Sequence, residues 1–352
     1  MAVSTRESRC GGAIVTTWYH EAEQVVGEIA TAVQEHRSIF LERLEALAGD
    51  VVSSLQRNDE LVVEALGGPA GPPLITNLIN VAILGTKVGI GLGYYGEELH
   101  QLALAGLVHD IGLFAVPKSL ITKPGRLTQE ERALIEGHPE LGYQVIEKCG
   151  PAYHCLGQLT RQAHERFNGQ GYPHRLKGRE ISEMALIVGV VDIFDALVSE
   201  RPYRRRLLPH EAVKELLVAE RRAFPREILK ALVEQLSVYP LGTTVRLTTG
   251  EIATVATVNS RYPLRPVVRL DEQQEHEGSS SCEIDLSRAP LVSIAEILNP
   301  PEVGRITFSR PPSKPAMSAV PIAASDSFTS LLESLDAVVL TLQGVVNSKR
   351  TS

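Results

Sequence analysis

Histidine and aspartate side chains that could bind a metal ion occur at several points where an apolar segment meets a polar one. His109 and Asp110 end the apolar run QLALAGLVHDIG, and His138 and His164 lie at the ends of two further helical segments. Asp192 lies within a long apolar run, where a carboxylate is costly unless it is paired or binds a cation. Imidazole and carboxylate ligands together suit iron, manganese or zinc better than calcium. The pattern therefore favours a transition-metal site.

Each of these groups alone also fits a purely structural role. Asp192 and Asp195 are three residues apart and so share one face of a helix, where either carboxylate could form an ion pair or a hydrogen bond to a loop. The His109–Asp110 pair could equally contain a capping or core histidine. The repetition of such groups where helices meet loops is what favours metal binding.

Helices are expected to position these side chains. Apolar residues recur at intervals of three to five residues over about 18–66, and GGPAGPP at 67–73 then interrupts the pattern. A run of helices is expected over about 74–238. Within it, the segment 182–197 is apolar on nearly all sides, which is typical of a buried helix.

The pattern changes after Pro240. The segment TTVRLTTGEIATVATV predicts two β-branched strands joined at a Thr-Gly-Glu turn, and RPVVRL predicts a third. A linker rich in Pro, Ser and Ala follows, and the last segment is an amphipathic helix suited to docking or to a dimer contact. We therefore expect an N-terminal helical segment, a helical core, a small β-module, a linker and a C-terminal amphipathic helix, with the bounds 1–73, 74–240, 241–308, 309–325 and 326–352.

The composition excludes several classes of protein. Of the 352 residues 43% are apolar, enough for a sizeable core, and a net charge of −7 disfavours binding to DNA or to a membrane surface. The four cysteines form no Cys-x-x-Cys pair, which argues against a disulfide framework or a zinc knuckle. No uninterrupted apolar run is long enough to cross a membrane, so we expect no membrane span and a cytoplasmic location.

Four motifs in the helical core carry a resemblance to a known family. HDIG at 109–112, IEGHPELG at 135–142, HERFNGQGYP at 164–173 and VVDIFDALVSERPYR at 190–204 look like the motifs of the HD-GYP family, in the same order and spacing. That family is a branch of the HD phosphohydrolases that cleaves the bacterial second messenger cyclic di-GMP. The resemblance covers roughly residues 74–240. It implies a mainly α fold, an HD-domain helical bundle, followed by the small β-module.

The resemblance also implies a set of metal ligands. Carried over position by position, these ligands are His109, Asp110, His138, His164 and Asp192, with His109 and Asp110 as the catalytic pair and Asp110 bridging two ions. One ion would keep His109, Asp110 and Asp192, and the other would keep Asp110, His138 and His164. The expected metal is a divalent transition metal, iron or manganese.

Four positions depart from the family pattern. Asn77 occupies the place of an upstream histidine ligand, Ala163 that of the first histidine of a His-His pair, Leu113 that of a lysine, and Asn168 that of an aspartate. Three protein ligands per ion can still bind a metal, but the loss of one imidazole from each ion should lower the affinity. The alternatives are thus two ions, a single ion or none, with His174 as a speculative replacement ligand.

Substrate binding is predicted at a group of arginines and at a tyrosine. Arg201 and Arg204 belong to a basic segment directly after the Asp192 helix, and a guanidinium matches the oxygens of a phosphate, although a solvated basic turn has the same sequence pattern. Tyr172 could stack on a guanine or support its own loop. By resemblance, Tyr172, Arg201 and Arg204 are the candidates for holding cyclic di-GMP.

Two functions compete on these grounds. The first is a metal-dependent phosphodiesterase acting on cyclic di-GMP, with activity that is intact, reduced or lost. The alternative is a catalytically degenerate HD-GYP domain, a signalling module that binds cyclic di-GMP or a protein partner such as a diguanylate cyclase domain. Hydrolysis of another nucleotide or phosphoester is a third and weaker interpretation, and homodimer formation through the last helix is a further one.

Overall fold

The computed structural model describes residues 4–68, 71–123, 125–199, 206–236, 239, 242–257, 265–271, 283–289, 291–292 and 294–299. These residues belong to two compact units, divided between Val238 and Tyr239, and each unit is described separately. The predicted phosphate-binding residues Arg201 and Arg204, the linker 309–325 and the C-terminal helix 326–352 lie outside the described residues.

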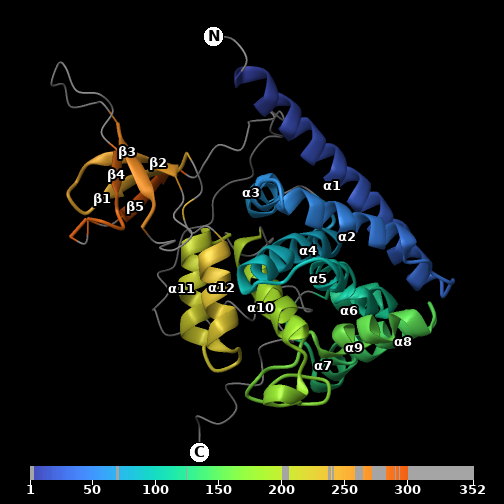
Figure 1. Cartoon of the computed structure of the whole chain (residues 1–352). Coiled ribbons are helices and arrows are strands. Elements are labelled where there is room, and N and C mark those ends of the chain that lie inside the picture. Colours follow the sequence, from blue (N-terminus) through green and yellow to red (C-terminus); the bar gives the residue numbers. More distant parts are fainter. Residues whose placement is uncertain are drawn as a thin grey trace, which may run out of the picture. The chain divides into compact units, whose positions relative to one another are not determined.

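The first unit is helical, as predicted for a mainly α protein (Figure 1). Its α-helices are α1 (Ser4–Gln34), α2 (Glu42–Leu55), α3 (Glu60–Gly67), α4 (Pro73–Leu92), α5 (Glu97–Val108), α6 (Lys118–Ile121), α7 (Gln129–Glu136), α8 (His138–Glu147), α9 (His154–Gln162), α10 (Glu183–Val198), α11 (Pro209–Ala219) and α12 (Arg226–Gln235). Its 3₁₀ helices are η1 (Ile111–Ala115), η2 (Pro151–Tyr153) and η3 (Gly178–Glu180).

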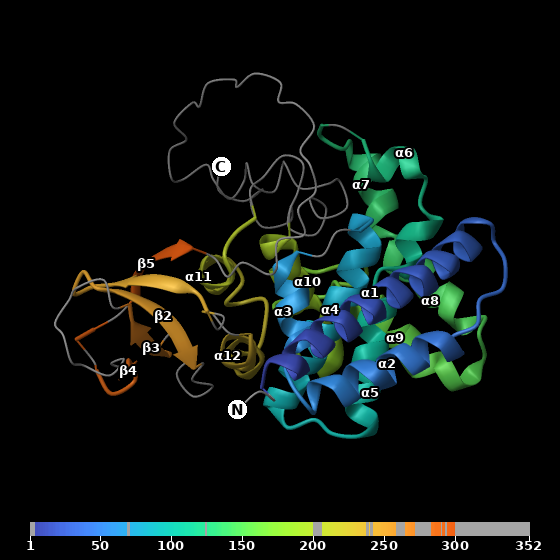
Figure 2. The ribbon, with the colours of Figure 1, turned by 90° about the horizontal axis from the view of Figure 1, so that it is seen from above.

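The helical pattern predicted for residues 18–66 corresponds to three helices, and the first of them begins earlier, at Ser4. His36 has a positive φ of 55°, which the chain adopts as it leaves α1. The Asn58 side chain accepts a hydrogen bond from the Glu60 amide, a local turn that separates α2 from α3. Helix α1 runs beside α2 and also contacts α3, α4 and η1 (Figures 1 and 2).

Three helices, α4, α5 and α10, pack against one another at the centre of this unit (Figure 1). Every residue of α10 from Ala185 to Val198 is buried, which confirms the prediction of a buried helix. The backbones of α4 and α5 approach so closely that a Cβ added at Gly106 would lie only 2.5 Å from the Cα of Ala82. Only glycine permits this contact, which holds α5 directly against α4 three residues before His109.

Helix α4 is long and apolar enough to cross a membrane by length and composition, with a mean hydropathy of 1.5. However, 67% of that apolar window is buried inside the described structure. The helix also contains Asn77 and Asn80, whose side chains are buried and hydrogen-bonded to aspartates of α10. These features are typical of a core helix of a helical domain.

The second unit is a five-stranded antiparallel sheet in the order β4-β3-β2-β1-β5. Its strands are β1 (Thr244–Leu247), β2 (Ile252–Thr257), β3 (Val267–Leu270), β4 (Glu283–Asp285) and β5 (Ile294–Asn299). Val245 of β1 pairs with Ala253 of β2, and Gly250 adopts a φ of +93° in the turn between them. The predicted hairpin and third strand are therefore present, whereas β4 and β5 have too short or too irregular a pattern to be predicted.

Candidate metal centre

His109 and Asp110 reach one site because the helix ends between them. On a regular helix adjacent side chains point about 100° apart. His109 still has helical dihedral angles as the C-cap of α5, but Asp110 leaves them, with φ −107° and ψ 16°. This change brings the two side chains together, with 3.7 Å between His109 Nε2 and Asp110 Oδ2.

The backbone fixes the orientation of two imidazole rings. His109 Nδ1 lies 2.9 Å from the Gly106 carbonyl oxygen, and His138 Nδ1 lies 2.8 Å from the Ile135 carbonyl oxygen. A carbonyl only accepts, so each Nδ1 carries the proton and donates it. When such a ring is neutral, its Nε2 keeps a lone pair that is available to a metal ion, the arrangement usual for metal-binding histidines.

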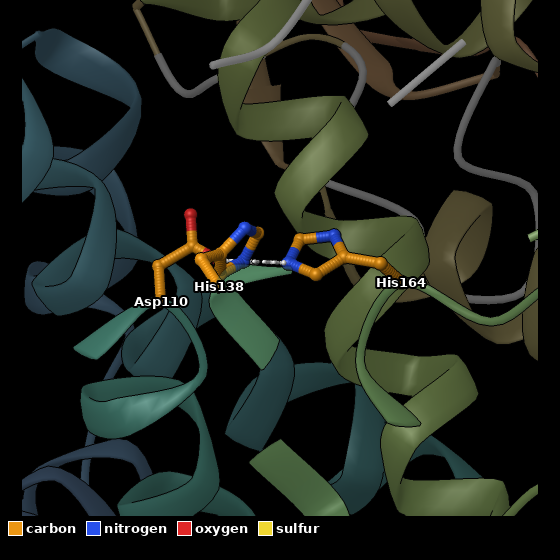
Figure 3. Close-up of side chains that lie close together, drawn as sticks. All are labelled: Asp110, His138 and His164. Atoms are coloured by element: carbon orange, nitrogen blue, oxygen red, sulfur yellow. Dashed lines mark hydrogen bonds and ion pairs between the residues drawn. The ribbon is translucent and has the colours of Figure 1, made fainter. Parts of the chain in front are cut away.

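His138 and His164 both point at one oxygen of Asp110 (Figure 3). The Asp110 Oδ1 atom lies 3.1 Å from His138 Nε2 and 2.7 Å from His164 Nε2, and the two Nε2 atoms are 3.0 Å apart. All three residues are buried. One cation placed among these atoms would satisfy both imidazole nitrogens and the carboxylate oxygen at once.

A second group of ligand atoms contains the other oxygen of Asp110. His109 Nε2 lies 3.7 Å from Asp110 Oδ2 and 3.7 Å from Asp192 Oδ1. His109 Nε2 and Asp192 Oδ2 are buried and have no hydrogen-bond partner among the described residues. Buried polar atoms are normally paired, so these unpaired ligand atoms fit a bound cation. The side chains present therefore suit two divalent ions that share Asp110.

Asn77 reaches this site, but as a hydrogen-bond donor. Its Nδ2 atom lies 3.2 Å from Asp192 Oδ1 and 2.8 Å from Asp195 Oδ2. Because carboxylates only accept hydrogen bonds, the amide nitrogen and not the oxygen must face them. In this arrangement Asn77 orients Asp192, instead of offering its carbonyl oxygen to a metal as its position in the sequence suggests.

Comparison with known proteins gives the family. Residues 76–228 match the model of the HD domain, a range that contains every residue of both ligand groups. The chain is 30% identical over 268 residues to the cyclic di-GMP phosphodiesterase PA4108 of Pseudomonas aeruginosa, an alignment that covers 75% of this chain and 58% of that one. Residues 76–228 therefore form an HD domain of the HD-GYP family.

Further matches cover other lengths of the chain. The chain is 36% identical over 143 residues to the response regulator RpfG of Xanthomonas campestris, which is named a cyclic di-GMP phosphodiesterase. This alignment covers 40% of this chain and 38% of the relative. The chain thus spans about 58% and 38% of the lengths of these two relatives. Residues 244–305 match a KOW domain associated with HD domains. An HDGYP protein from Bdellovibrio bacteriovorus has the same helical fold, with a TM-score of 0.52, 19% identity and 62% and 70% of the two chains covered.

The structure gives the surroundings of three positions that were predicted to depart from the HD-GYP pattern. Leu113, at the position where a lysine was expected, packs in an apolar cluster with Val116, Leu120 and Ile135. Asn168 is exposed, and its side chain bonds to Gln170 within the loop. Ala163 is also buried, and its side chain is a methyl group. Neither Ala163 nor Leu113 can therefore supply a polar atom at its buried position.

His174 joins neither ligand group of the described structure. Its Nε2 atom instead lies 3.6 Å from Glu140 Oε2. The two groups of possible ligands contain only the five residues predicted as ligands, and the suggestion that His174 replaces a missing one has no support in the geometry of the described residues.

Tyr172 of the GYP segment lies against His164, one of the predicted ligands. Its ring is parallel to that of His164, with an interplanar angle of 5° and 5.1 Å between the centroids, and only 5% of the residue is exposed. Of the two roles considered for Tyr172, this position favours support over stacking on a guanine. The ring holds His164, whose Nδ1 has no hydrogen-bond partner among the described residues.

Glu165 is a functional candidate that the sequence did not reveal. It is fully buried, and its carboxylate accepts hydrogen bonds from the backbone amides of His174 and Leu176, at 2.7 and 3.0 Å. These bonds hold the end of the segment that contains Tyr172. The only signal in the sequence was an acidic residue directly after His164, in a segment otherwise typical of a loop.

The charges of the metal-free site follow from burial and from its two carboxylates. Burial lowers the pKa of His109, but Asp110 and Asp192 outweigh this effect and raise the pKa to about 9. For His164 burial dominates, and the pKa falls to about 4 despite Asp110. Burial raises the pKa of Asp110, but the nearby histidines lower it well below the usual range. At neutral pH His109 is therefore protonated and His164 is neutral.

Metal binding is consequently expected to displace a proton from His109. With a His109 pKa of about 9, Mn²⁺ binding at pH 7 should release about one proton from this residue, and the affinity should increase as the pH rises toward 9. Calorimetric titrations in two buffers of different protonation enthalpy measure the release. A His154→Gln variant, altered at an exposed histidine paired with Glu147, should release the same amount. Titrations that do not depend on the buffer would contradict the prediction.

Proposed function

We propose that this chain is a metal-dependent phosphodiesterase of the HD-GYP type that hydrolyses cyclic di-GMP in the cytoplasm. The observation that supports it best is the pair of buried ligand groups that share the two oxygens of Asp110. We infer the substrate from the two relatives, both of which are named cyclic di-GMP phosphodiesterases. Iron or manganese bound at these groups would supply Lewis-acid chemistry for cleavage of a phosphodiester.

The protein side chains have distinct tasks in this proposal. His109, Asp110 and Asp192 would hold one ion, and Asp110, His138 and His164 would hold the other. Hydrogen bonds from Asn77 keep Asp192 oriented, and the ring of Tyr172 keeps His164 in place. Arg201 and Arg204 would bind the phosphates of the dinucleotide through their planar guanidinium groups.

The test is an anaerobic assay of the purified chain with Mn²⁺ or Fe²⁺ and cyclic di-GMP. We expect chromatography to show the linear dinucleotide or GMP, with the Asp110→Asn chain as the blank for contaminating enzymes. Cyclic di-GMP binding without any product at high protein concentration would contradict the proposal and favour a binding module. A cyclic dinucleotide with adenine in place of one guanine, assayed in parallel, tests the base preference.

The number of ions is tested separately by metal analysis of the chain after anaerobic loading with Fe²⁺ or Mn²⁺. We propose two ions, because each ligand group provides three protein atoms and leaves positions for water and substrate. A stoichiometry of one ion per chain would restrict the proposal to a mononuclear site.

A further inference from the structure

A series of buried hydrogen bonds connects helix α1 to the metal centre. The Tyr19 hydroxyl donates to Asn80 Oδ1 at 2.8 Å, and Asn80 Nδ2 donates to Asp195 Oδ1 at 2.8 Å. Asn77 Nδ2 then donates both to Asp195 Oδ2 at 2.8 Å and to Asp192 Oδ1 at 3.2 Å. All five residues are buried, and Asp192 belongs to the second ligand group, with His109 and Asp110.

The direction of these hydrogen bonds is determined by chemistry. The carboxylate of Asp195 can only accept, so the amide nitrogens of Asn77 and Asn80 must both face it. This orientation turns the carbonyl oxygen of Asn80 toward Tyr19, whose hydroxyl must then be the donor. Rotating the amide of Asn80 would place an acceptor against Asp195, which is unfavourable in a buried position. The hydroxyl of Tyr19 therefore holds Asn80 in one orientation.

Helix α1 lies outside the range that matches the HD domain, residues 76–228. It nevertheless contacts both η1, which directly follows Asp110, and α4, which contains Asn77 (Figure 2). A shift of α1 would thus affect both the segment that follows Asp110 and the helix that contains Asn77, next to the second ligand group.

We propose that Tyr19 is a positioning residue of the metal centre, acting through Asn80, Asp195 and Asn77 on the orientation of Asp192. Helix α1 then contributes to metal binding, because it supplies the hydrogen-bond donor at the start of this series. This inference rests on the proposed function only in that the two ligand groups bind divalent ions.

The experiment compares the Mn²⁺ affinity of the intact chain with that of two Tyr→Phe variants by calorimetric titration. Tyr19→Phe removes the donor to Asn80. Tyr94→Phe is the matched control, because the Tyr94 hydroxyl donates to Glu183 Oε1 at 2.6 Å, near the end of α4 and the start of α10 but outside the connected series. We expect a roughly threefold to tenfold weaker affinity for Tyr19→Phe and less than about a twofold change for Tyr94→Phe.

A double-variant cycle adds a readout that a general loss of stability would not give. Asn80→Ala should weaken Mn²⁺ binding at least as much as Tyr19→Phe, and the double variant should bind like Asn80→Ala alone, because both changes interrupt the same series. Equal affinities of Tyr19→Phe and Tyr94→Phe would overturn the proposal, as would additive effects in the cycle. Since affinity is measured, the result decides the role of Tyr19 whether or not the chain hydrolyses cyclic di-GMP. An intact chain that binds no Mn²⁺ would overturn both proposals.

Discussion

The Asp110→Asn variant is expected to lose both metal ions and, with them, catalysis. Asp110 Oδ1 lies within 3.1 Å of the Nε2 atoms of His138 and His164, and Oδ2 faces His109. An amide in its place removes the negative charge and presents an N–H donor to one of the two groups. We expect the Mn²⁺ affinity to fall by at least about a hundredfold at both groups, since even the loss of a partner behind a ligand costs tenfold to a hundredfold.

The matched variant is Asp192→Asn, which changes only the group that contains His109. Metal analysis after loading should give one ion per chain for Asp192→Asn and none for Asp110→Asn. Circular dichroism should show the same helix content in both. Retention of one ion by Asp110→Asn would mean that the two groups bind metal independently, and that Asp110 is not shared.

The second large effect is expected from Glu165→Ala, which should loosen the segment that contains Tyr172. The amides of His174 and Leu176 would lose the acceptor of two part-buried hydrogen bonds. We expect the free energy of unfolding to fall by about 1–3 kcal/mol, from about 0.5–1.5 kcal/mol for each hydrogen bond. Denaturant titration measures the loss, and hydrogen exchange should be faster over residues 167–178.

Glu180→Ala is the control for this change. Glu180 also accepts a backbone hydrogen bond in the same segment, from the Lys177 amide at 2.7 Å, but it is exposed. Its loss should cost no more than about 0.5 kcal/mol, as is usual at surface positions. Similar losses for the two variants would show that Glu165 contributes only an ordinary surface bond.

Local patterns in the sequence predicted the parts of the site that depend on local structure. His109 and Asp110 lie where an apolar helix ends, and Asp192 lies in a helix that is apolar on nearly all sides, so their burial followed from the sequence. The grouping of these residues with His138 and His164 did not follow from periodicity. It came from a resemblance in the order and spacing of the motifs.

Contacts between distant residues could not be predicted in this way. The hydroxyl of Tyr19 bonds to Asn80, 61 positions away, and Asn77 bonds to Asp192, 115 positions away. Nothing in the spacing of these residues indicates the contact or which end of an amide faces a carboxylate. The short strand β4 lacked a signal for another reason, because its three residues are too few to show an alternating pattern.

The glycine contact between α5 and α4 limits how far the backbone around the metal centre can move when an ion binds. At Gly112, two residues after Asp110, a Cβ would lie 2.0 Å from the His138 carbonyl oxygen, so the η1 backbone also packs directly against that of α8. Backbones in direct contact cannot be separated or compressed by changing rotamers. The spacing of the helices that carry the predicted ligands is therefore rigid. A metal centre of this kind would select ions by their radius, because its backbone cannot adjust to ions of different size.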